Sequence, residues 1–473
     1  MKVVSCEKMA DIDGEAQKTF FIPPEILMEN AGIRALEAWR DTFHCGKWKK
    51  GKYLFIAGGG NNGGDALVMA RSAWISGVED ISIIIVSEKH SSAVSLHIKI
   101  CAALGLKIHS WERDPEKCQE DILEASVIFD GINGTGIKGA LREDYVPLVH
   151  HINRSKGEVV AIDLPSGLGD NYKEQYPAVR ASVTLTLGLP KLCLYLPLGR
   201  EYCGKILTVK IGFPNPLIED PKIPGELLNW DRVRLDLPRI PKTAYKNLRG
   251  HVGVFAGNRG TLGAAVLCAK SADRALAGLV TLFVDSSIYP IAASLLLSCL
   301  VKPWDGNLEE IDLGNFNSLC LGPGWGLSGR ESLLKHLIGL GIPGVLDADG
   351  ITLLSRFPEP VNLQENWVLT PHLGEFCRLS RADKHLVLKD PLSYLLPRCS
   401  EWNTPIVLKG HVSYIGNPDG RYWILDGMNP CLGTGGSGDL LAGIIAGLLA
   451  TGIQPLEAAL TGVALHDRIG KLA

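Results

Sequence analysis

The chain has 473 residues, which at about 100 to 200 residues per domain predicts two to four domains, most simply two. Its 48 basic and 51 acidic side chains give a formal charge of -3, a balance that excludes a protein whose main partner is nucleic acid or an anionic membrane. Hydrophobic residues make up 46% and charged residues 21%, which excludes a largely disordered chain.

The cysteines and apolar stretches predict a cytoplasmic protein. The twelve cysteines are scattered and form no CxxC pair, so neither a zinc ribbon nor a dense disulfide framework fits. Cys268 and Cys320 lie in apolar runs and are expected to be buried, reduced thiols. The N-terminus carries charges throughout, and the longest apolar stretch, 440–453, is shorter than the ~20 residues that a membrane span needs.

The first part of the chain predicts a parallel sheet wrapped by helices, in a domain of residues 1–215. Short β-branched runs (YLFIA, ISIIIV, VIFD, VVAID and SVTLTLGL) alternate with helical patterns at 65–75 and 93–104. The first ~50 residues include the helical segment MENAGIRALEAWRD, which can cap this domain or form an interface. We expect a homo-oligomer.

A second α/β domain is predicted over residues 225–473. The proline-rich segment 213–226 has no periodicity and is interpreted as a linker. Strand-like runs then follow, from HVGVFAG to RYWILDG, and the last motif, GTGGSGD, precedes an apolar helix. Each strand runs into glycine or aspartate, and such strand ends open onto the ligand crevice of open α/β sheets. The fold class is therefore α/β, with two doubly wound domains.

Gly58 to Asp65, GGGNNGGD, is the first candidate site. It follows a strand, opens a helix and satisfies GxGxxG, a motif that is weak by itself. A glycine-rich turn without ligand and a nicotinamide-dependent oxidoreductase with Glu88 as ribose partner are both open readings. Asp65 weakens the oxidoreductase reading, because a carboxylate in the first helical turn opposes pyrophosphate binding.

Two further strands end in Asp130 and Asp163. With Asp65, these carboxylates should converge on one crevice, where a cation or protonation must relieve their repulsion. Helix capping can explain any one of them but explains all three poorly.

The motifs GGGNNGGDALVMAR, D-x-x-x-GTG and D-x-PSG resemble the epimerase half of the bifunctional NAD(P)H-hydrate repair enzymes. The resemblance implies a Rossmann-like domain that interconverts the R and S epimers of NADHX and NADPHX, in which the nicotinamide ring is hydrated at C6. Ala66 and Asn133 depart from the family pattern, where glycine and an aromatic residue are common.

The resemblance also implies site residues in this domain. The hydrated dinucleotide would be held by Asn61, Asn62, Gly63, Gly64 and Asp65, by Gly134, Thr135, Gly136, Ile137, Lys138, Gly139 and Ala140, and by Asp163. Asn62, Asp130 and Ser166 would bind K⁺, since oxygen ligands with one carboxylate suit a hard cation of low charge. Asp163 is expected to act as the acid/base on the C6 hydroxyl proton, assisted by Lys138, although Lys138 can equally be a solvated loop lysine.

The second domain combines strand-end loops with an anion-binding helix terminus. No GxxxxGK[ST] occurs, so a P-loop enzyme is excluded. Residues 433–439 aim backbone N–H groups at one point, which suits an anion. Asp439 beside them suits a base that deprotonates a hydroxyl during phosphoryl transfer, and a plain N-cap role is the alternative.

The motifs GTLGAA, GPGWG, TPHLGE and GTGGSGD resemble the ribokinase-like, ADP-dependent NAD(P)H-hydrate dehydratases over nearly all of residues 245–473. By this resemblance, Ala265, Gly326, His372 and Asp439 contact the hydrated substrate, and Glu375 orients water around Mg²⁺. The adenine nucleotide, ADP, would bind Lys409, Gly410, His411, Val412, Ser413 and Gly438. Leu373 replaces a usual proline, and the family pattern leaves room for a further helix after Ala473.

The resemblance implies that Asp439 takes the C6 hydroxyl proton, that ADP phosphorylates this oxygen, and that AMP and phosphate leave. The alternative function is a small-molecule sugar or vitamin kinase of the ribokinase type, using ATP, with a regulatory nucleotide-binding N-terminal domain. A third reading makes the first domain a binding module.

Overall fold

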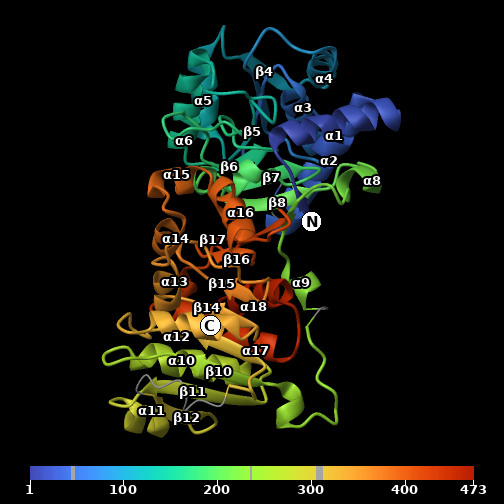
Figure 1. The fold of residues 1–473 in the computed structure, drawn as a ribbon. Coiled ribbons are helices and arrows are strands. Elements are labelled where there is room, and N and C mark those ends of the chain that lie inside the picture. The colour runs from blue at the N-terminus through green and yellow to red at the C-terminus, as the bar shows by residue number, and fades with distance from the viewer. Residues whose placement is uncertain (44–47, 49, 235–236, 305–312) are drawn as a thin grey trace. The chain divides into compact units, whose positions relative to one another are not determined.

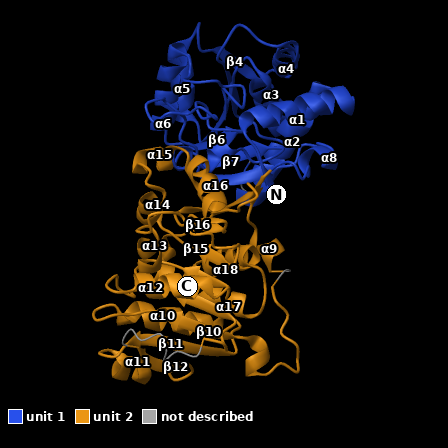
Figure 2. Cartoon of the chain, viewed as in Figure 1, with its two compact units in different colours: residues 1–223 blue, residues 224–473 orange. Residues whose placement is uncertain are grey.

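The computed structural model describes residues 1–43, 48, 50–234, 237–304 and 313–473. Cys45, expected to be a reduced thiol, lies outside this range. The chain divides into two compact units, residues 1–223 and 224–473, shown in different colours in Figure 2. This division falls inside the segment that was expected to be a linker. Among the described residues, no helix has the length and apolar composition to cross a membrane.

The first unit is built on a seven-stranded sheet in which all neighbouring strands are parallel, in the order β4-β3-β2-β5-β6-β7-β8. The strands are β2 (Tyr53–Ala57), β3 (Ile81–Ile85), β4 (Lys107–Ser110), β5 (Val127–Gly131), β6 (Glu158–Ile162), β7 (Val183–Leu187) and β8 (Lys205–Val209), and β1 is the short strand Lys2–Val3. The predicted strands are confirmed. β4 was missed because it is a short edge strand whose residues are exposed or half-buried.

Helices cover both faces of this sheet (Figure 1). They are α1 (Cys6–Thr19), α2 (Pro24–Phe43), α3 (Asn61–Ile75), α4 (Ser92–Ala103), α5 (Pro115–Glu124), α6 (Val146–Arg154) and the short α7 (Pro197–Arg200) and α8 (Asn215–Ile218), with 3₁₀ turns η1 (Glu143–Tyr145) and η2 (Leu192–Leu194). Alternate residues of β2 enter different cores. Tyr53 and Phe55 pack with α1 to α3, whereas Leu54 and Ile56 pack with α5 and α6.

The second unit has a larger mixed sheet, in which β9-β18-β17-β16-β15-β14-β13-β10-β11-β12 are neighbours. The strands are β9 (Gly225–Leu227), β10 (His251–Phe255), β11 (Leu279–Asp285), β12 (Leu300–Trp304), β13 (Ser318–Leu321), β14 (Gly344–Leu346), β15 (Trp367–Leu369), β16 (Ile406–Leu408), β17 (Val412–Gly416) and β18 (Tyr422–Asp426). Adjacent strands are parallel from β12 through β11, β10, β13, β14 and β15 to β16, and β17 is antiparallel to both β16 and β18. β12 was missed because it is mostly exposed and contains Pro303, which an edge strand tolerates.

Two layers of helices also flank this sheet (Figure 1). They are α9 (Trp230–Val233), α10 (Leu262–Arg274), α11 (Tyr289–Leu295), α12 (Glu331–Gly339), α13 (Asp349–Leu354), α14 (Leu373–Ser380), α15 (Lys384–Lys389), α16 (Pro391–Trp402), α17 (Ser437–Ala450) and α18 (Pro455–Gly470), with turns η3 (Lys246–Arg249) and η4 (Pro430–Leu432). One core joins the sheet to α10, α17 and α18. On the other face Phe255 stacks on Phe283, with ring centroids 4.6 Å apart.

The cysteine prediction is confirmed for the described thiols. All of them are free and most are buried, and the Sγ atoms of Cys268 and Cys320 lie 3.4 Å apart inside the second unit.

Helices α10 and α17 approach so closely that glycine is required at their crossing. A Cβ atom built at Gly443 would collide with the carbonyl oxygen of Cys268 and the hydroxyl of Ser271. Gly443→Ala should therefore lower the free energy of unfolding of the second unit by about 1 to 3 kcal/mol, measured by denaturant titration. The matched control is Gly339→Ala, where a Cβ atom meets nothing within 4 Å. A stability loss as large in the control would contradict the steric explanation.

Candidate active sites

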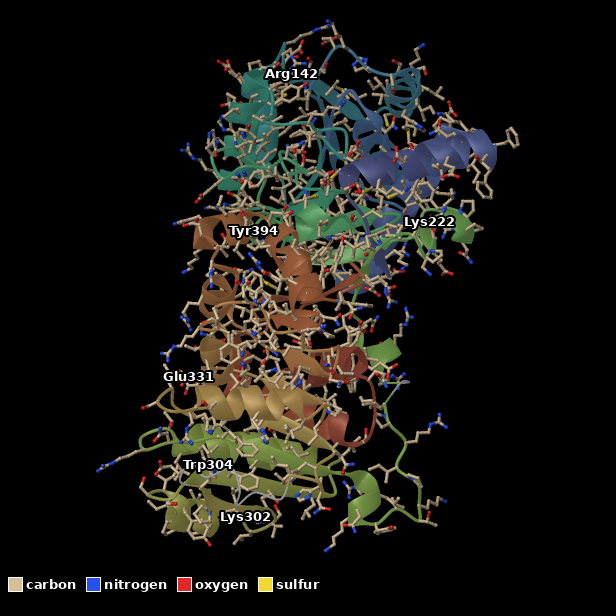
Figure 3. All side chains as sticks on the ribbon, viewed as in Figure 1. Arg142, Lys222, Lys302, Trp304, Glu331 and Tyr394 are labelled. Carbon is tan, nitrogen blue, oxygen red and sulfur yellow. The ribbon has the colours of Figure 1, made fainter. Side chains whose placement is uncertain are left out.

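The first unit holds a cavity of about 530 Å³ at the carboxyl ends of β2, β5 and β6. Of the residues predicted from the sequence, those that line it are Asn61, Asn62, Asp65, Gly134, Thr135, Gly136, Ile137 and Asp163. Gly63 and Gly64 are buried in the first turn of α3, and Lys138, Gly139 and Ala140 lie in the same loop as Gly134 without lining the cavity. Arg142, labelled in Figure 3, also lines it from the segment between β5 and α6.

Close backbone contacts shape the turn that opens α3. A Cβ atom at Gly58 would collide with the carbonyl oxygen of Ile132, and one at Gly63 with the carbonyl oxygen of Gly58. The turn is therefore built for close packing as well as for a ligand. A Cβ atom at Gly134 would lie 3.3 Å from both Asn62 Cγ and Asp163 Oδ2, so the GTG loop meets the two other motifs at one place.

Asp163 is held in a strained conformation by a buried lysine. Its φ of 66° is left-handed, which is uncommon for a residue with a Cβ atom. Lys191 Nζ forms an ion pair with its Oδ1, and the N–H of Leu187 donates to the same oxygen at 3.1 Å. Lys191 is only 1% exposed and also donates to the carbonyl oxygen of Leu187 at 2.6 Å. This cation holds the Asp163 carboxylate at the cavity wall.

The crowding of carboxylates has a clear electrostatic effect on Asp65. Burial raises its pKa well above the usual value, and the charges of Asp163 and Asp13 raise it further, whereas Lys191 opposes them. Asp65 is the fifth residue of α3 and so lies just beyond the first turn, not within it as was predicted from the sequence. Lys191 provides a cation for Asp163, and at Asp65 burial and the neighbouring carboxylates favour the neutral form.

Asp130 is fully buried and does not line the cavity, which corrects the expectation that all three carboxylates open onto it. Its Oδ1 accepts from Ser166 Oγ at 2.6 Å, and its Oδ2 accepts from the N–H of Ser166 at 2.8 Å. Burial raises its pKa to about 6, although these hydrogen bonds lower it. Asn62 Nδ2 donates to the carbonyl oxygen of Asn133 at 2.9 Å. Asn62 Oδ1 is buried without a hydrogen-bond partner among the described residues.

The second unit holds a cavity of about 760 Å³ at the loops that follow β15, β16 and β18. Of the predicted residues, those that line it are His372, Lys409, Gly410, His411, Ser413 and Gly438. Val412 is a buried residue of β17. Gly326 and Ala265 lie elsewhere. The N–H of Gly326 donates to Asp349 Oδ2 at 2.8 Å, and Ala265 is completely buried in α10, so their contacts with substrate stay predictions.

Asp439 lies in the first turn of α17, where backbone N–H groups point away from the helix. The pKa of Asp439 is raised to about 6. Burial is the main cause, the charges of Asp347 and Glu375 add to it, and Lys409 opposes them. The turn is made by Gly436, whose φ of 93° favours glycine. A carboxylate with this pKa is a usable base near neutral pH.

The buried Asp347 and the half-buried Lys409 form an ion pair beside this helix terminus. Lys409 Nζ lies 2.7 Å from Asp347 Oδ1, which also accepts from Thr370 Oγ1 at 2.9 Å. A Cβ atom at Gly438 would lie 3.2 Å from Lys409 Nζ, so the ion pair and the helix terminus are adjacent. Ala348, the residue after Asp347, has a φ of 46°, which marks backbone strain in the loop that carries Asp347.

His372 and Glu375 form a reciprocal cap at the start of α14. His372 Nδ1 accepts from the N–H of Gly374 at 2.9 Å, and Glu375 Oε2 accepts from the N–H of His372 at 2.8 Å. Glu375 is buried, which raises its pKa, whereas Lys409 lowers it. His372 therefore has a structural role that the sequence did not reveal, and it is exposed at the cavity wall.

Sequence reasoning missed Lys191, Asp347, His466 and Asp467 as site residues. Asp347 had a usable signal, because it ends a buried strand as Asp163 does. Lys191 had little signal, since its partner is 28 residues away in the sequence. Glu88, considered as a ribose ligand, instead pairs with Arg113 at 2.9 Å on the surface.

Two nucleotide-sized cavities at the carboxyl ends of parallel strands, each beside an ion pair of a lysine and a strand-end carboxylate, define a two-domain α/β enzyme. A family model described as NAD(P)H-hydrate dehydratase matches residues 252–473, and one described as YjeF-related protein N-terminus matches residues 24–193. The first unit is Rossmann-like and the second ribokinase-like, as predicted.

Similarity to characterised relatives extends over the full chain. It is 33% identical to the bifunctional NAD(P)H-hydrate repair enzyme Nnr of Moorella thermoacetica, over 99% of this chain and 92% of the relative. The Coxiella burnetii enzyme of the same name is 32% identical over 93% and 88% of the two chains. The chain belongs to the family of bifunctional NAD(P)H-hydrate repair enzymes.

A solved structure of an ADP/ATP-dependent NAD(P)H-hydrate dehydratase from Bacillus subtilis, co-crystallised with ATP/Mg²⁺, is 28% identical. The match covers 52% of this chain and 89% of that chain, with a TM-score of 0.47. The sugar or vitamin kinase alternative is less well supported, because the model that matches the second unit is described as NAD(P)H-hydrate dehydratase and the full-length relatives are named NAD(P)H-hydrate repair enzymes.

Lys191→Ala should destabilise the first unit strongly, because it leaves Asp163 as a buried charge without its cation. We expect a loss of about 3 to 5 kcal/mol in the free energy of unfolding, measured by denaturant titration. The exposed Lys138 provides the matched control, and Lys138→Ala should change stability by no more than about 0.5 kcal/mol. Equal effects of the two substitutions would show that the ion pair does not position Asp163.

Proposed function

We propose that this chain repairs hydrated nicotinamide cofactors in two steps. The first unit epimerises R and S NADHX and NADPHX, and the second dehydrates the S form with ADP, giving NAD(P)H, AMP and phosphate. Membership of the repair family supports this proposal. The observation that carries it is the position of Asp439, a base with a pKa of about 6, at the terminus of α17 beside Lys409 and Asp347.

The dehydration must turn a poor leaving group into a good one. Asp439 takes the proton of the C6 hydroxyl, and the freed oxygen attacks the β-phosphorus of ADP, so that the bond between that phosphorus and AMP breaks. The electron pair of the ring nitrogen then expels phosphate from C6, and loss of a ring proton restores NAD(P)H. The N–H groups of α17 and the Lys409 ammonium stabilise the charge on the transferred phosphoryl group.

For the epimerisation we assign the acid/base role to Asp163. It removes the proton of the C6 hydroxyl while the bond from C6 to the ring nitrogen breaks, which leaves an aldehyde at C6, and it returns the proton when the nitrogen adds to the other face of that aldehyde. The ion pair with Lys191 orients the Asp163 carboxylate, so Lys191 is a positioning residue. The hydrated dinucleotide would lie along the α3 terminus and the loop 134–140. A role for the exposed Lys138 stays a prediction.

The residues present fit both proposed cations. The orphaned Asn62 Oδ1, with the Asp130 and Ser166 oxygens, is a set of hard ligands suited to K⁺, which would neutralise charge beside the dinucleotide. Glu375 is engaged in its helix cap, which suits contact with Mg²⁺ through water better than direct ligation. That the protein is cytoplasmic and forms a homo-oligomer also stays a prediction.

Asp163→Asn should separate the two activities. It removes the acid/base but keeps the size of the side chain, so R-to-S conversion should fall by about a hundredfold or more. Dehydration of the purified S epimer should be unchanged, because the second cavity is intact. Epimerisation is followed by chromatography of the two hydrates, and wild-type rates in the variant would refute the role of Asp163.

The dehydration rate should depend on the charge of Asp439. The base acts when deprotonated, so kcat/KM should fall as the pH drops below about 6 and level off above it. Asp347→Asn removes a charge that raises this pKa and should move the acid limb to lower pH. Asp439→Asn should still bind ADP in calorimetry but lose turnover. Unimpaired turnover, or an acid limb that Asp347→Asn does not shift, would refute the assignment.

A further inference from the structure

One wall of the second cavity ends in a carboxylate oxygen to which none of the described residues donates a hydrogen bond. Asp467, near the end of α18, lines the cavity and is 7% exposed. Its Oδ2 pairs with Lys471 Nζ at 2.7 Å, and its backbone carbonyl accepts from Asn429 Nδ2 at 3.2 Å. Its Oδ1 is buried without a hydrogen-bond partner among the described residues. A Cβ atom at Gly427, on the facing loop, would lie only 3.4 Å from that oxygen.

The neighbouring residue presents a second unused polar atom to the same cavity. His466 Nε2 is also buried without a partner among the described residues. Burial lowers the pKa of the ring, Lys409 lowers it further, and Asp467 and a hydrogen bond to the backbone of Ser437 oppose them. A neutral ring that donates to the Ser437 carbonyl leaves Nε2 as an acceptor.

A buried acceptor that receives no hydrogen bond costs free energy. The two acceptors on this wall therefore favour a ligand that supplies hydrogen-bond donors. Phosphate oxygens are acceptors and carry negative charge, which excludes the phosphates of a nucleotide from this wall. The donors that suit the phosphates are the N–H groups at the start of α17, around Gly438, and the Lys409 ammonium, which belong to the same cavity. The donors of a nucleotide are its ribose hydroxyls and the exocyclic amino group of its base, and apolar side chains of the same cavity can cover the base: Leu425, Met428, Leu432 and Val463.

We propose that Asp467, with His466, recognises the hydrogen-bond donors of the nucleoside part of the phosphoryl donor and sets its nucleotide specificity. The inference rests on the proposed function in that it places a nucleotide in this cavity. Both sources of donor have the same chemistry, since carboxylates accept from ribose hydroxyls as from exocyclic amino groups. Only one oxygen of Asp467 is available, so one donor is the expected partner of this side chain.

The test compares ADP with two analogues that each lack one kind of donor. In 2′,3′-dideoxy-ADP both ribose hydroxyls are missing, and in IDP a carbonyl replaces the amino group. Wild-type dehydration should favour ADP over at least one analogue by about tenfold or more in kcat/KM, the usual effect of a hydrogen bond to a charged group. Asp467→Ala should abolish that preference, and Asp467→Asn, which keeps an oxygen acceptor, should retain part of it.

A control on the same helix keeps the test specific. Glu457 is exposed near the start of α18 and does not line the cavity, so Glu457→Ala should leave the preference unchanged. If Asp467→Ala lowers kcat/KM equally for all three nucleotides, or if the wild type does not discriminate between them, the inference is wrong.

Binding measurements separate this inference from the proposed function. Calorimetry of ADP, 2′,3′-dideoxy-ADP and IDP with the full chain needs no hydrated substrate. The tenfold preference and its loss in Asp467→Ala should appear there even if the hydrates are not turned over, which would refute the proposed function alone. Equal affinities for all three nucleotides would refute the inference alone.

Discussion

An ion pair between a lysine and a strand-end carboxylate is the feature on which both sites depend. Asp163 follows β6 and pairs with the buried Lys191, and Asp347 follows β14 and pairs with the half-buried Lys409. Parallel strands bring their carboxyl ends, and the acidic residues there, to one edge of the sheet. Without a cation, burial and mutual repulsion favour the neutral form of such residues, and both raise the pKa of Asp65.

The ion pair has a different role in each unit. In the first unit, Lys191 positions Asp163, the carboxylate to which we assign the acid/base role in epimerisation. In the second unit, Lys409 holds Asp347, and the assigned base is the neighbouring Asp439. Burial and the nearby carboxylates raise the pKa of Asp439, and Lys409 lowers it. The amides of α17 and the Lys409 ammonium then stay available for a phosphate. A stereospecific dehydratase would strand one epimer, so an epimerase on the same chain has a clear use.

Much of this was predictable from the sequence, because the signals are local. A β-branched run that ends in glycine or aspartate predicts both a strand and its place at the crevice, which is how Asp163 was singled out. Asp439 was singled out by a glycine-rich motif that precedes an apolar helix. Long-range partners left no such signal. The roles of Lys191 and Asp467 can be inferred only from the fold, which shows the groups that their charged atoms face. Edge strands such as β4 and β12 were missed for another reason, because they lack the buried pattern that marks central strands.

The most direct test of the account is to give the purified protein an equilibrated mixture of R and S hydrates with ADP, and to follow the absorbance of the reduced cofactor together with AMP. The account predicts that recovery of reduced cofactor proceeds past the S fraction to nearly the whole mixture, with one AMP formed for each cofactor restored. Recovery that stops at the S fraction would contradict the epimerase assignment. Formation of cofactor without AMP would contradict the phosphoryl-transfer mechanism.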